Sequence, residues 1–305
     1  MKPIHQIGLF AMSSKGHATL KALIDRFGAQ AIGFVVGATD GAVHNDHSQE
    51  IAQTCHKYGI QWMDRHRPDS RKPAVSLMMA VSWRWLLDPP VGSQLVVLHD
   101  SLLPRYRGFA PLVNSLINGE PHIGVSAVLV EGMGAADSGP IVLQRSVPVD
   151  YPITIGEAIA LIEVAYSDLA CDIVDLVMSG PLIGVPQVES EASFSPWLDD
   201  LDYEIDWTLS AQQVRRFVDA VGYPYRGAAT ELDGRTVRVI RCEEHPKPPR
   251  LERPAPGKVI MIDPRGPCVA CGSGAVILLD VRQGDSSLGA LPLKRFRVRF
   301  GRRRA

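Results

Sequence analysis

The chain has 305 residues, a net charge of −1, and a composition that is 46% hydrophobic and 21% charged. These values are typical of a soluble globular protein. The net charge excludes an overall electrostatic attraction of the chain to polyanions. No apolar run approaches the roughly 18 residues of a membrane helix, and the first residues, MKPIHQIGLFAM, are interrupted too soon for a signal peptide. We therefore expect a cytoplasmic protein that makes no membrane contact.

Cysteine usage also indicates a reducing compartment. The cysteines are odd in number and spread over a long chain, which does not suit a disulfide framework: Cys55, Cys171, Cys242, Cys268 and Cys271. The last two form a lone CxxC in PCVACG. A zinc site needs a second pair of ligands, and a redox CxxC would open a helix, whereas VACGSGAVILL predicts strand, turn and strand. We therefore interpret this pair as structural and expect no metal site.

Strands and helices alternate through the first part of the chain. The apolar run IHQIGLFAM leads through Ser13 and Ser14, placed to cap a helix, into HATLKALIDRFG. The patterns predict further buried strands at 31–38, 74–83 and 94–99, and a helix at 48–59. Buried strands that alternate with helices predict an α/β fold with a doubly wound, mostly parallel sheet, whose ligands bind at the carboxyl ends of the strands.

The composition changes near residue 180. Strands at 123–132 and 140–149 flank the turn MGAADSG, and a long amphipathic helix at 154–180 ends at a glycine. The next residues are rich in Pro, Ser and acidic side chains, as in a linker. SAQQVRRFVDAVG is one further helix, and the short strands after it predict a small β-barrel-like domain. We therefore expect a sheet domain at 1–180, a linker at 181–204 and a β-rich domain at 205–305.

The chain ends in the basic segment KRFRVRFGRRRA. Such a segment can bind phosphates. However, arginines alternate with apolar residues over 295–300, which is typical of an edge strand with one solvent-exposed face. We favour the edge strand as the interpretation.

The segment VVLHDSLLPRYRGFAPLVNSLINGE carries the strongest chemical signal. His99 ends a buried strand at the edge where ligands bind, and a histidine there can act as a general acid or donate to an oxyanion. Pro104 and Gly108 shape the following loop, and Arg107 adds anion-binding capacity. Downstream, Asp137 lies in a turn of small residues, from which a carboxylate can reach an imidazole. On spacing alone, a catalytic pair and a structural histidine with an unrelated turn aspartate are both open.

An ordered set of motifs resembles a known family. H-x-S-L-L-P-x-Y-R-G, a helix ending in NGE, a GVS strand and a D-x-G-x-I turn are similar to the folate-dependent formyltransferases, which include methionyl-tRNA formyltransferases and sugar-nucleotide N-formyltransferases. Beyond the linker, DYEIDWTLSAQQVRRFVDAVGYPYRGAATELDGRTVRV resembles the start of the family's OB-like C-terminal domain. The resemblance covers nearly the whole chain.

The resemblance implies an enzyme that passes the formyl group of 10-formyltetrahydrofolate, its cosubstrate, to a primary amine. His99 would stabilise the oxyanion of the tetrahedral intermediate, and Asp137 would orient it and help take the amine proton. Trp83 and Trp85 follow a strand, as residues near the family's pterin pocket do, although two core tryptophans would give the same pattern. The other expected binding residues belong to the loop after His99 and to the next helix: Ser101, Leu102, Leu103, Pro104, Arg107, Gly108 and Asn114.

Val97 departs from the family pattern. The family carries an asparagine two residues before the histidine, and a valine offers no donor to an oxyanion. Losing one such donor typically costs about 10²–10³ in rate. Three interpretations are open. Asn114 or Ser126 substitutes for the amide, the chemistry has changed while the scaffold and folate site persist, or the chain is a weakly active or purely binding descendant.

The acceptor amine is expected to be small. No Lys or Arg occurs from Gln30 to Thr54, where tRNA-binding members of the family carry basic residues, and VGYPYRGA resembles the sugar-nucleotide enzymes. We therefore expect an amino sugar, as its nucleotide, or another small amine. The C-terminal arginines favour the alternative enzyme, a methionyl-tRNA formyltransferase. A folate-binding protein without catalysis is the alternative that is not an enzyme.

Overall fold

The computed structural model describes residues 7–41, 43–66, 72–88, 92–130 and 136–301. The chain forms two compact units. The N-terminal unit comprises Met1–Leu112, Pro121–Val149 and Ala158–Pro196, and the C-terminal unit comprises Val113–Glu120, Asp150–Glu157 and Trp197–Ala305.

A seven-stranded sheet forms the centre of the N-terminal unit, with the order β3-β2-β1-β4-β5-β7-β8. The first five strands in this order are parallel, and β7 and β8 continue the sheet antiparallel. The predicted mostly parallel sheet is therefore confirmed. The strands are β1 (Ile7–Ala11), β2 (Ile32–Gly37), β3 (Trp62–Asp64), β4 (Leu77–Val81), β5 (Gln94–His99), β7 (His122–Leu129) and β8 (Ile141–Pro148).

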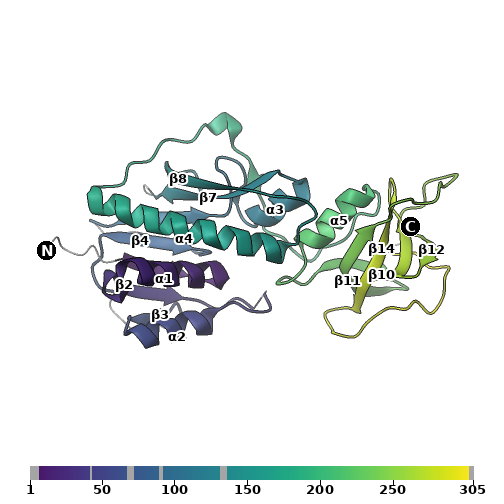
Figure 1. The fold of residues 1–305 in the computed structure, drawn as a ribbon, viewed down its shortest axis with the longest axis horizontal. Coiled ribbons are helices and arrows are strands. Elements are labelled where there is room, and N and C mark those ends of the chain that lie inside the picture. Colours follow the sequence, from purple (N-terminus) through teal and green to yellow (C-terminus); the bar gives the residue numbers. More distant parts are fainter. Residues whose placement is uncertain (1–6, 42, 67–71, 89–91, 131–135, 302–305) are drawn as a thin grey trace. The chain divides into compact units, whose positions relative to one another are not determined.

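Three helices lie side by side across one face of this sheet, in the order α2, α1, α4 (Figure 1). They are α1 (Ser13–Phe27), α2 (Ser48–Tyr58) and α4 (Ile155–Ser179). Leu20, Leu23 and Ile24 of α1 are buried because the apolar positions recur at helical spacing and face the sheet. Gly59 ends α2 in the left-handed conformation, as its position after the helix predicts.

An apolar cluster also contains residues from β1, β2, β4 and β5. It includes the buried Phe10, Phe34 and Met78, and the partly buried Trp83 and Val97 pack against it. Every residue of β1 and β4 is buried, as expected for parallel strands covered on both faces. Burial of a large apolar side chain such as Phe34 contributes about 1.5–3 kcal/mol, so these strands hold the site rigidly.

The chain order reverses between β1 and β4, which is where such sheets form a ligand crevice. Ser13 and Ser82 follow these two strands, and the Ser13 hydroxyl donates to the Ser82 hydroxyl at 3.0 Å. Both residues have positive φ, 62° and 54°. The expected capping of α1 by a serine is therefore wrong, because Met12 is the N-cap residue and no side chain caps the helix.

Part of the segment expected to be a linker packs on the N-terminal unit. Val185 bridges to Ile141 of β8, and β9 (Phe194–Ser195) pairs with β6 (Arg107–Gly108) directly after the predicted site loop. The domain boundaries at 180 and 204 stay a prediction.

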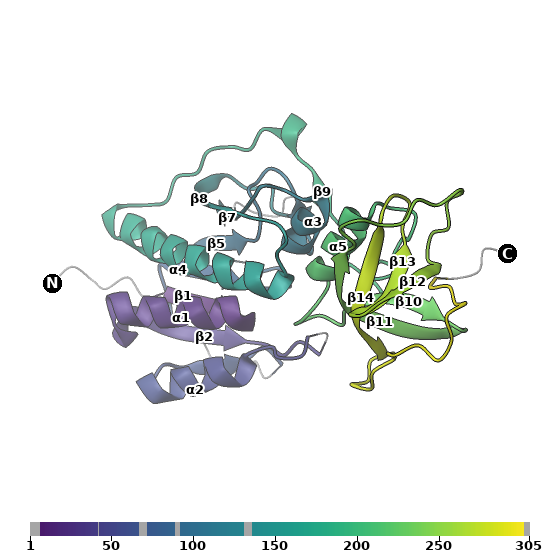
Figure 2. The same ribbon diagram turned by 45° about the vertical axis from the view of Figure 1, so that its right-hand side comes forward.

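The C-terminal unit contains a five-stranded antiparallel sheet with the order β10-β11-β14-β13-β12 (Figure 2). The sequence thus predicts the fold class of both units correctly. The helix α5 (Ala211–Ala220) begins with a capping box formed by Ser210 and Gln213, and α3 (Pro111–Asn118) clusters mainly with this unit. The strands are β10 (Ala228–Leu232), β11 (Arg235–Glu244), β12 (Val259–Asp263), β13 (Gly266–Ala270) and β14 (Ala275–Gln283).

The C-terminal basic segment follows the expected alternation only in part. Val298 and Phe300 are buried, and Phe300 bridges to Leu232, whereas Phe296 is 48% exposed. Arg295, Arg297 and Arg299 face outward. The edge-strand interpretation therefore fits residues 298–300 and fails at Phe296.

All five cysteines are free and buried. Cys268 lies on β13 and Cys271 in the turn before β14, which matches the predicted strand, turn and strand. Burial raises the pKa of the Cys268 thiol to about 11 and that of Cys271 to about 12, so neither is poised to react as a thiolate. Within the described residues, no helix has the length and hydropathy needed to cross a membrane.

Candidate active site

His99 is the last residue of β5 and is 7% exposed. Its ring is held at the carboxyl edge of the sheet because β5 is paired on both sides, to β4 and to β7. The Nε2 atom lies 2.8 Å from the main-chain oxygen of Tyr106, in the loop that follows. The loop therefore fixes the orientation of the imidazole.

Asp137 lies against the other side of this ring. Its Oδ1 atom is 3.5 Å from Nδ1 of His99, and its Oδ2 atom accepts a 2.9 Å hydrogen bond from the main-chain N–H of Gly108. Asp137 has a positive φ of 56°, which a short side chain tolerates in a tight turn. The structure thus brings together the two residues that the sequence proposed as a pair, although their catalytic role stays a prediction.

The two ring nitrogens of His99 both face oxygen atoms. A neutral imidazole carries a single N–H. If that N–H is on Nε2 and donates to the Tyr106 oxygen, Nδ1 and Oδ1 of Asp137 are both acceptors. Their contact is then favourable only when a proton lies between them. The pair can therefore hold one proton at the ligand edge of the sheet, as general acid–base chemistry requires.

The loop Ser101, Leu102, Leu103 and Pro104 is rigid through its own hydrogen bonds. The hydroxyl of Ser126 on β7 donates to the Ser101 oxygen at 2.6 Å and accepts from the Leu103 N–H at 3.1 Å. Gln144 also donates to this hydroxyl, at 2.7 Å. Ser126 therefore has no remaining capacity to replace the missing asparagine. Ser101 donates to the Arg105 oxygen at 2.7 Å, so it shapes the loop.

Arg107 is 1% exposed and its guanidinium is engaged inside the protein. It donates to the side-chain oxygen of Gln187 and to both carboxylate oxygens of Glu189, at distances of 2.7 to 3.0 Å. The hydrogen bond from Arg107 lowers the pKa of Glu189. Gln187 and Glu189 were not anticipated, because a Pro- and Ser-rich segment gives no periodic signal. The predicted contact of Arg107 with a ligand stays a prediction.

Sequence reasoning also missed a partly buried ion pair beside His99. Asp100 contacts Lys15 of α1 and accepts a hydrogen bond from the hydroxyl of Tyr166 on α4. Burial alone would raise the pKa of Asp100, but the charge of Lys15 and the hydrogen bonds outweigh it and lower the pKa. Burial raises the pKa of Tyr166 well above its usual value. This cluster ties α1 and α4 to the end of β5.

Val97 lies two residues before His99, so both side chains point to the same face of β5. The side chain of Val97 is partly buried against the apolar cluster that includes Phe10 and Met78. Apolar packing therefore occupies the position where the resemblance leads one to expect an amide.

Trp83 and Trp85 form an aromatic group just after β4. The Trp83 ring meets Phe10 at a centroid distance of 5.3 Å and Trp85 at 5.0 Å, and the guanidinium of Arg65 lies 3.8 Å from the Trp85 ring centroid. Among the described residues, the buried indole N–H of Trp83 has no hydrogen-bond partner. An unpaired buried donor costs about 1–3 kcal/mol, which a bound acceptor would offset.

Asn114 lies on α3, in the part of that helix that clusters with the C-terminal unit. Its predicted contribution to the site stays a prediction.

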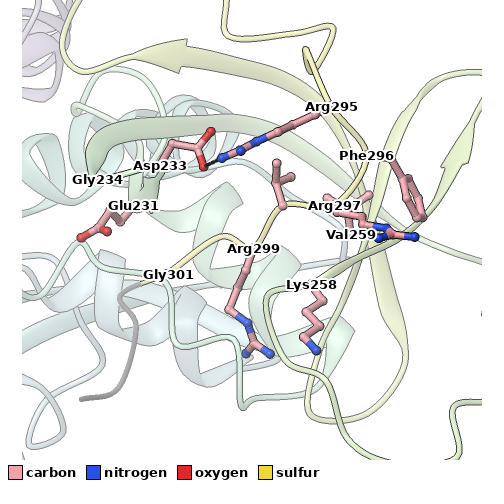
Figure 3. Close-up of a pocket in the computed structure, with 11 residues that line it drawn as sticks. Glu231, Asp233, Gly234, Lys258, Val259, Arg295, Phe296, Arg297, Arg299 and Gly301 are labelled. Carbon is pink, nitrogen blue, oxygen red and sulfur yellow. Dashed lines mark hydrogen bonds and ion pairs between the residues drawn. The ribbon is translucent and has the colours of Figure 1, made fainter.

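A basic groove of about 900 Å³ lies on the C-terminal unit (Figure 3). Arg295 pairs with Asp233 across it, and Arg299 donates to the Pro256 oxygen at 2.7 Å. Lys258 and Arg297 also line the groove. This groove is the surface through which the basic C-terminal segment could contact phosphates.

Comparison with known families decides the relationship. The family model described as formyl transferase matches residues 67–162, and the model described as formyl transferase, C-terminal domain, matches residues 198–290. This chain belongs to the formyl transferase family. The two matches fall on both units in the order that the motifs predicted.

The chain is similar in sequence to methionyl-tRNA formyltransferases. It is 30% identical to that of Geobacter sulfurreducens over 197 residues, which are 65% of this chain and 59% of the relative. It is 32% identical to that of a Roseiflexus species over 201 residues, which are 64% and 57% of the two chains. The match thus spans about three fifths of the length of these relatives.

The fold is shared with solved formyltransferase structures. An N-formyltransferase from Helicobacter canadensis, in complex with folinic acid and dTDP-3-aminofucose, superimposes with a TM-score of 0.66 and 12% identity over 92% of this chain and 99% of that one. HypX from Aquifex aeolicus superimposes with a TM-score of 0.60 and 15% identity over 92% of this chain and 44% of its own. At these identities the likeness concerns the fold.

Proposed function

We propose that the protein transfers a formyl group from 10-formyltetrahydrofolate to the primary amine of an amino sugar, carried as its nucleotide, or of another small molecule. The observation that carries the proposal is the contact between His99 and Asp137 at the carboxyl end of β5. Membership of the formyl transferase family supports the reaction class.

The aromatic group after β4 fits a flat heterocyclic cosubstrate. Trp83 and Trp85 supply ring surface at the ligand edge of the sheet, and the indole N–H of Trp83, which has no partner in the described part of the chain, offers a donor to a ring nitrogen or carbonyl. When bound, 10-formyltetrahydrofolate supplies an activated formyl group. We assign these two tryptophans to its binding.

His99 then stabilises the negative charge that develops during the transfer, and Asp137 accepts the amine proton. Attack by the amine nitrogen on the formyl carbon places negative charge on the formyl oxygen and positive charge on the nitrogen. Asp137 takes the proton from that nitrogen, and a protonated His99 stabilises the oxyanion. As the bond between the formyl carbon and N10 breaks, the proton passes to N10, which leaves formamide and tetrahydrofolate.

Because Val97 stands where the family has an asparagine, stabilisation of the oxyanion depends on His99. Valine cannot donate a hydrogen bond, and the hydroxyl of Ser126 is engaged by the site loop. We infer a site in which His99 exchanges the contact of its Nε2 with the Tyr106 oxygen for one with the oxyanion when the substrates bind, so that this N–H is the donor that β5 presents. Such a site is slower than one with two donors by about 10²–10³.

The charge of the β2 loop supports a small acceptor. Residues 38–47 carry Asp40 and Asp46 but no lysine or arginine. A loop without lysine or arginine beside the crevice offers no cation to the polyanionic backbone of tRNA and tolerates a small amine.

A formyl-transfer assay tests the proposal. The purified chain is incubated with 10-formyltetrahydrofolate and a panel of amines that includes amino-sugar nucleotides, and formamide products are identified by mass spectrometry. We expect enzyme-dependent formylation of at least one small amine. Formation of no product from any amine, with folate binding intact, would contradict the proposed function.

A second candidate function is formylation of methionyl-tRNA. It is favoured by the relatives at about 30% identity and by the basic groove of the C-terminal unit. If it holds, tRNA binding weakens steeply as salt rises, and Lys258→Glu and Arg297→Glu each weaken it further. Arg265→Glu is the matched control, because Arg265 is already paired with Asp263 and Glu243. A gel shift that detects no tRNA binding at low salt excludes this candidate.

A further inference from the structure

We propose that Gln187 is a positioning residue for Asp137, and that Arg107 sets the orientation of its amide. The inference rests on the proposed function, because it concerns the same pair of reacting groups. It also assigns a role to residues 187–195, which the composition suggests are only a linker.

The side-chain amide of Gln187 contacts the turn that carries Asp137. Its Nε2 atom donates to the main-chain oxygen of Asp137 at 2.6 Å and to that of Gly139 at 2.8 Å. Two hydrogen bonds from one planar group fix the two carbonyls relative to each other. They therefore limit rotation of the backbone on either side of Ser138.

Arg107 determines which way this amide faces. Two nitrogens of its guanidinium donate to Oε1 of Gln187, at 3.0 and 2.8 Å. Because a guanidinium carries only hydrogen-bond donors, it can bond to the amide oxygen but not to the NH₂ group. The NH₂ group is therefore directed to the two carbonyls. Glu189 holds the opposite side of the guanidinium, at 2.7 and 2.9 Å.

The network closes on the reacting groups. Gly108, next to Arg107, donates its main-chain N–H to Oδ2 of Asp137, and the oxygen of Tyr106 contacts His99. Pairing of β6 with β9 keeps this backbone in place. Asp137 is thus held at its carboxylate by Gly108 and at its main chain by Gln187. The positive φ of Asp137 costs some backbone energy, which these contacts offset.

The test compares Gln187→Ala and Gln187→Glu with the parent. A displacement of about 1 Å between reacting groups can cost 10²-fold in rate, so Gln187→Ala should lower kcat about 10- to 100-fold, with KM for both substrates changed less than about twofold. The matched control is Gln94→Ala. Gln94 makes two hydrogen bonds to the backbone of Leu182, in the same segment, but none to the Asp137 turn. It should keep the parent kcat.

Gln187→Glu separates positioning from simple structural support. The substituted carboxylate still pairs with Arg107 but sets an oxygen against the two carbonyls. Positioning predicts a loss of kcat at least as large as that of Gln187→Ala. Parent-like turnover of Gln187→Glu would show that only the partner of Arg107 matters and would overturn the proposal. If Gln187→Ala does not fold, the comparison of Gln187→Glu with the parent still tests the proposal.

A spectroscopic measurement distinguishes failure of this inference from failure of the proposed function. In protein with ¹⁵N-labelled histidine and no substrate, the ring nitrogen shifts of His99 report its contact with Asp137. We expect these shifts to move in both Gln187 variants and not in Gln94→Ala. Unchanged shifts in the Gln187 variants overturn the positioning role, whether or not the parent transfers formyl groups.

Discussion

At the scale of single residues, Val97 packs against an apolar cluster at the position where the family resemblance predicts a hydrogen-bond donor. Val97→Asn places an amide against the apolar cluster, so we expect the free energy of unfolding to fall by about 1–3 kcal/mol. The amide also returns a donor to the face of His99, so kcat for formyl transfer should rise, up to about 10²-fold. Melting curves and steady-state rates measure both effects. Val97→Ala, which loses packing without gaining a donor, should show no gain, and a fall of kcat in Val97→Asn contradicts the account.

Asp219 on α5 should make stability depend on pH. Burial raises its pKa from 3.8 to about 6, against the opposing charge of Arg215, and nearby Glu157 raises it further. The folded state therefore binds the proton more tightly, so stability falls as pH rises from about 4 to about 6 and stays lowered above that. Asp219→Asn removes this cost. We expect a stabilisation of about 1–2 kcal/mol at pH 8 that vanishes near pH 4.

Melting temperatures measured across this pH range check the sign. Asp25→Asn, at an exposed position of α1, is the matched control and should change little at any pH. An Asp219→Asn variant less stable than the parent at pH 8 would show that the contact with Arg215 outweighs burial.

At the scale of elements, the patterns that predicted correctly are those with a local cause. β5 begins and ends as its apolar run predicts, and α2 ends at the glycine that can adopt positive φ. The short strands β6 and β9 could not be predicted, because two residues carry no period and their pairing depends on tertiary contact. Ser13 failed as a cap for the same reason, since its hydroxyl contacts Ser82 far along the chain.

The capping box of α5 gives a prediction at this scale. The Ser210 hydroxyl accepts from the Gln213 N–H at 3.2 Å, and the Gln213 side chain accepts from the Ser210 N–H at 3.1 Å. Ser210→Ala should cost about 1 kcal/mol, because a main-chain donor at the helix start loses its partner. Urea unfolding measures the loss. Ser179→Ala at the end of α4 should cost less, and equal costs would show that the box contributes nothing.

At the scale of the whole molecule, both fold classes could be predicted from the alternation of strands and helices, and the meeting of His99 with Asp137 from the resemblance of the ordered motifs to a known family, since spacing alone left that pair open. The partners of Asp137 could not. Gln187 reaches it from fifty positions away through backbone atoms, which leave no signature in the sequence. The partly buried pair of Lys15 and Asp100 is likewise a tertiary contact, between the start of α1 and the residue after β5.

Folate binding should stabilise the molecule as a whole. We expect the folate to bind to the predicted sheet domain, residues 1–180. A reduced folate at 100 times its dissociation constant should add about 2.7 kcal/mol of stability to the full chain, which raises the melting temperature measurably. Trp83→Phe keeps one aromatic ring but removes the indole donor, so binding should weaken about 5- to 10-fold. Trp197→Phe, at a position 63% exposed, is the control. No thermal shift with any saturating folate contradicts the assignment.

The central claim is that His99 and Asp137 together perform formyl transfer, and steady-state formylation of the best amine tests it most directly. His99→Ala and Asp137→Ala should each lower kcat/KM by at least about 10²-fold while the protein stays folded, because each variant removes a partner of the shared proton. His122→Ala, an exposed histidine on β7, should retain the parent rate. Parent-level turnover by either His99→Ala or Asp137→Ala would contradict the account.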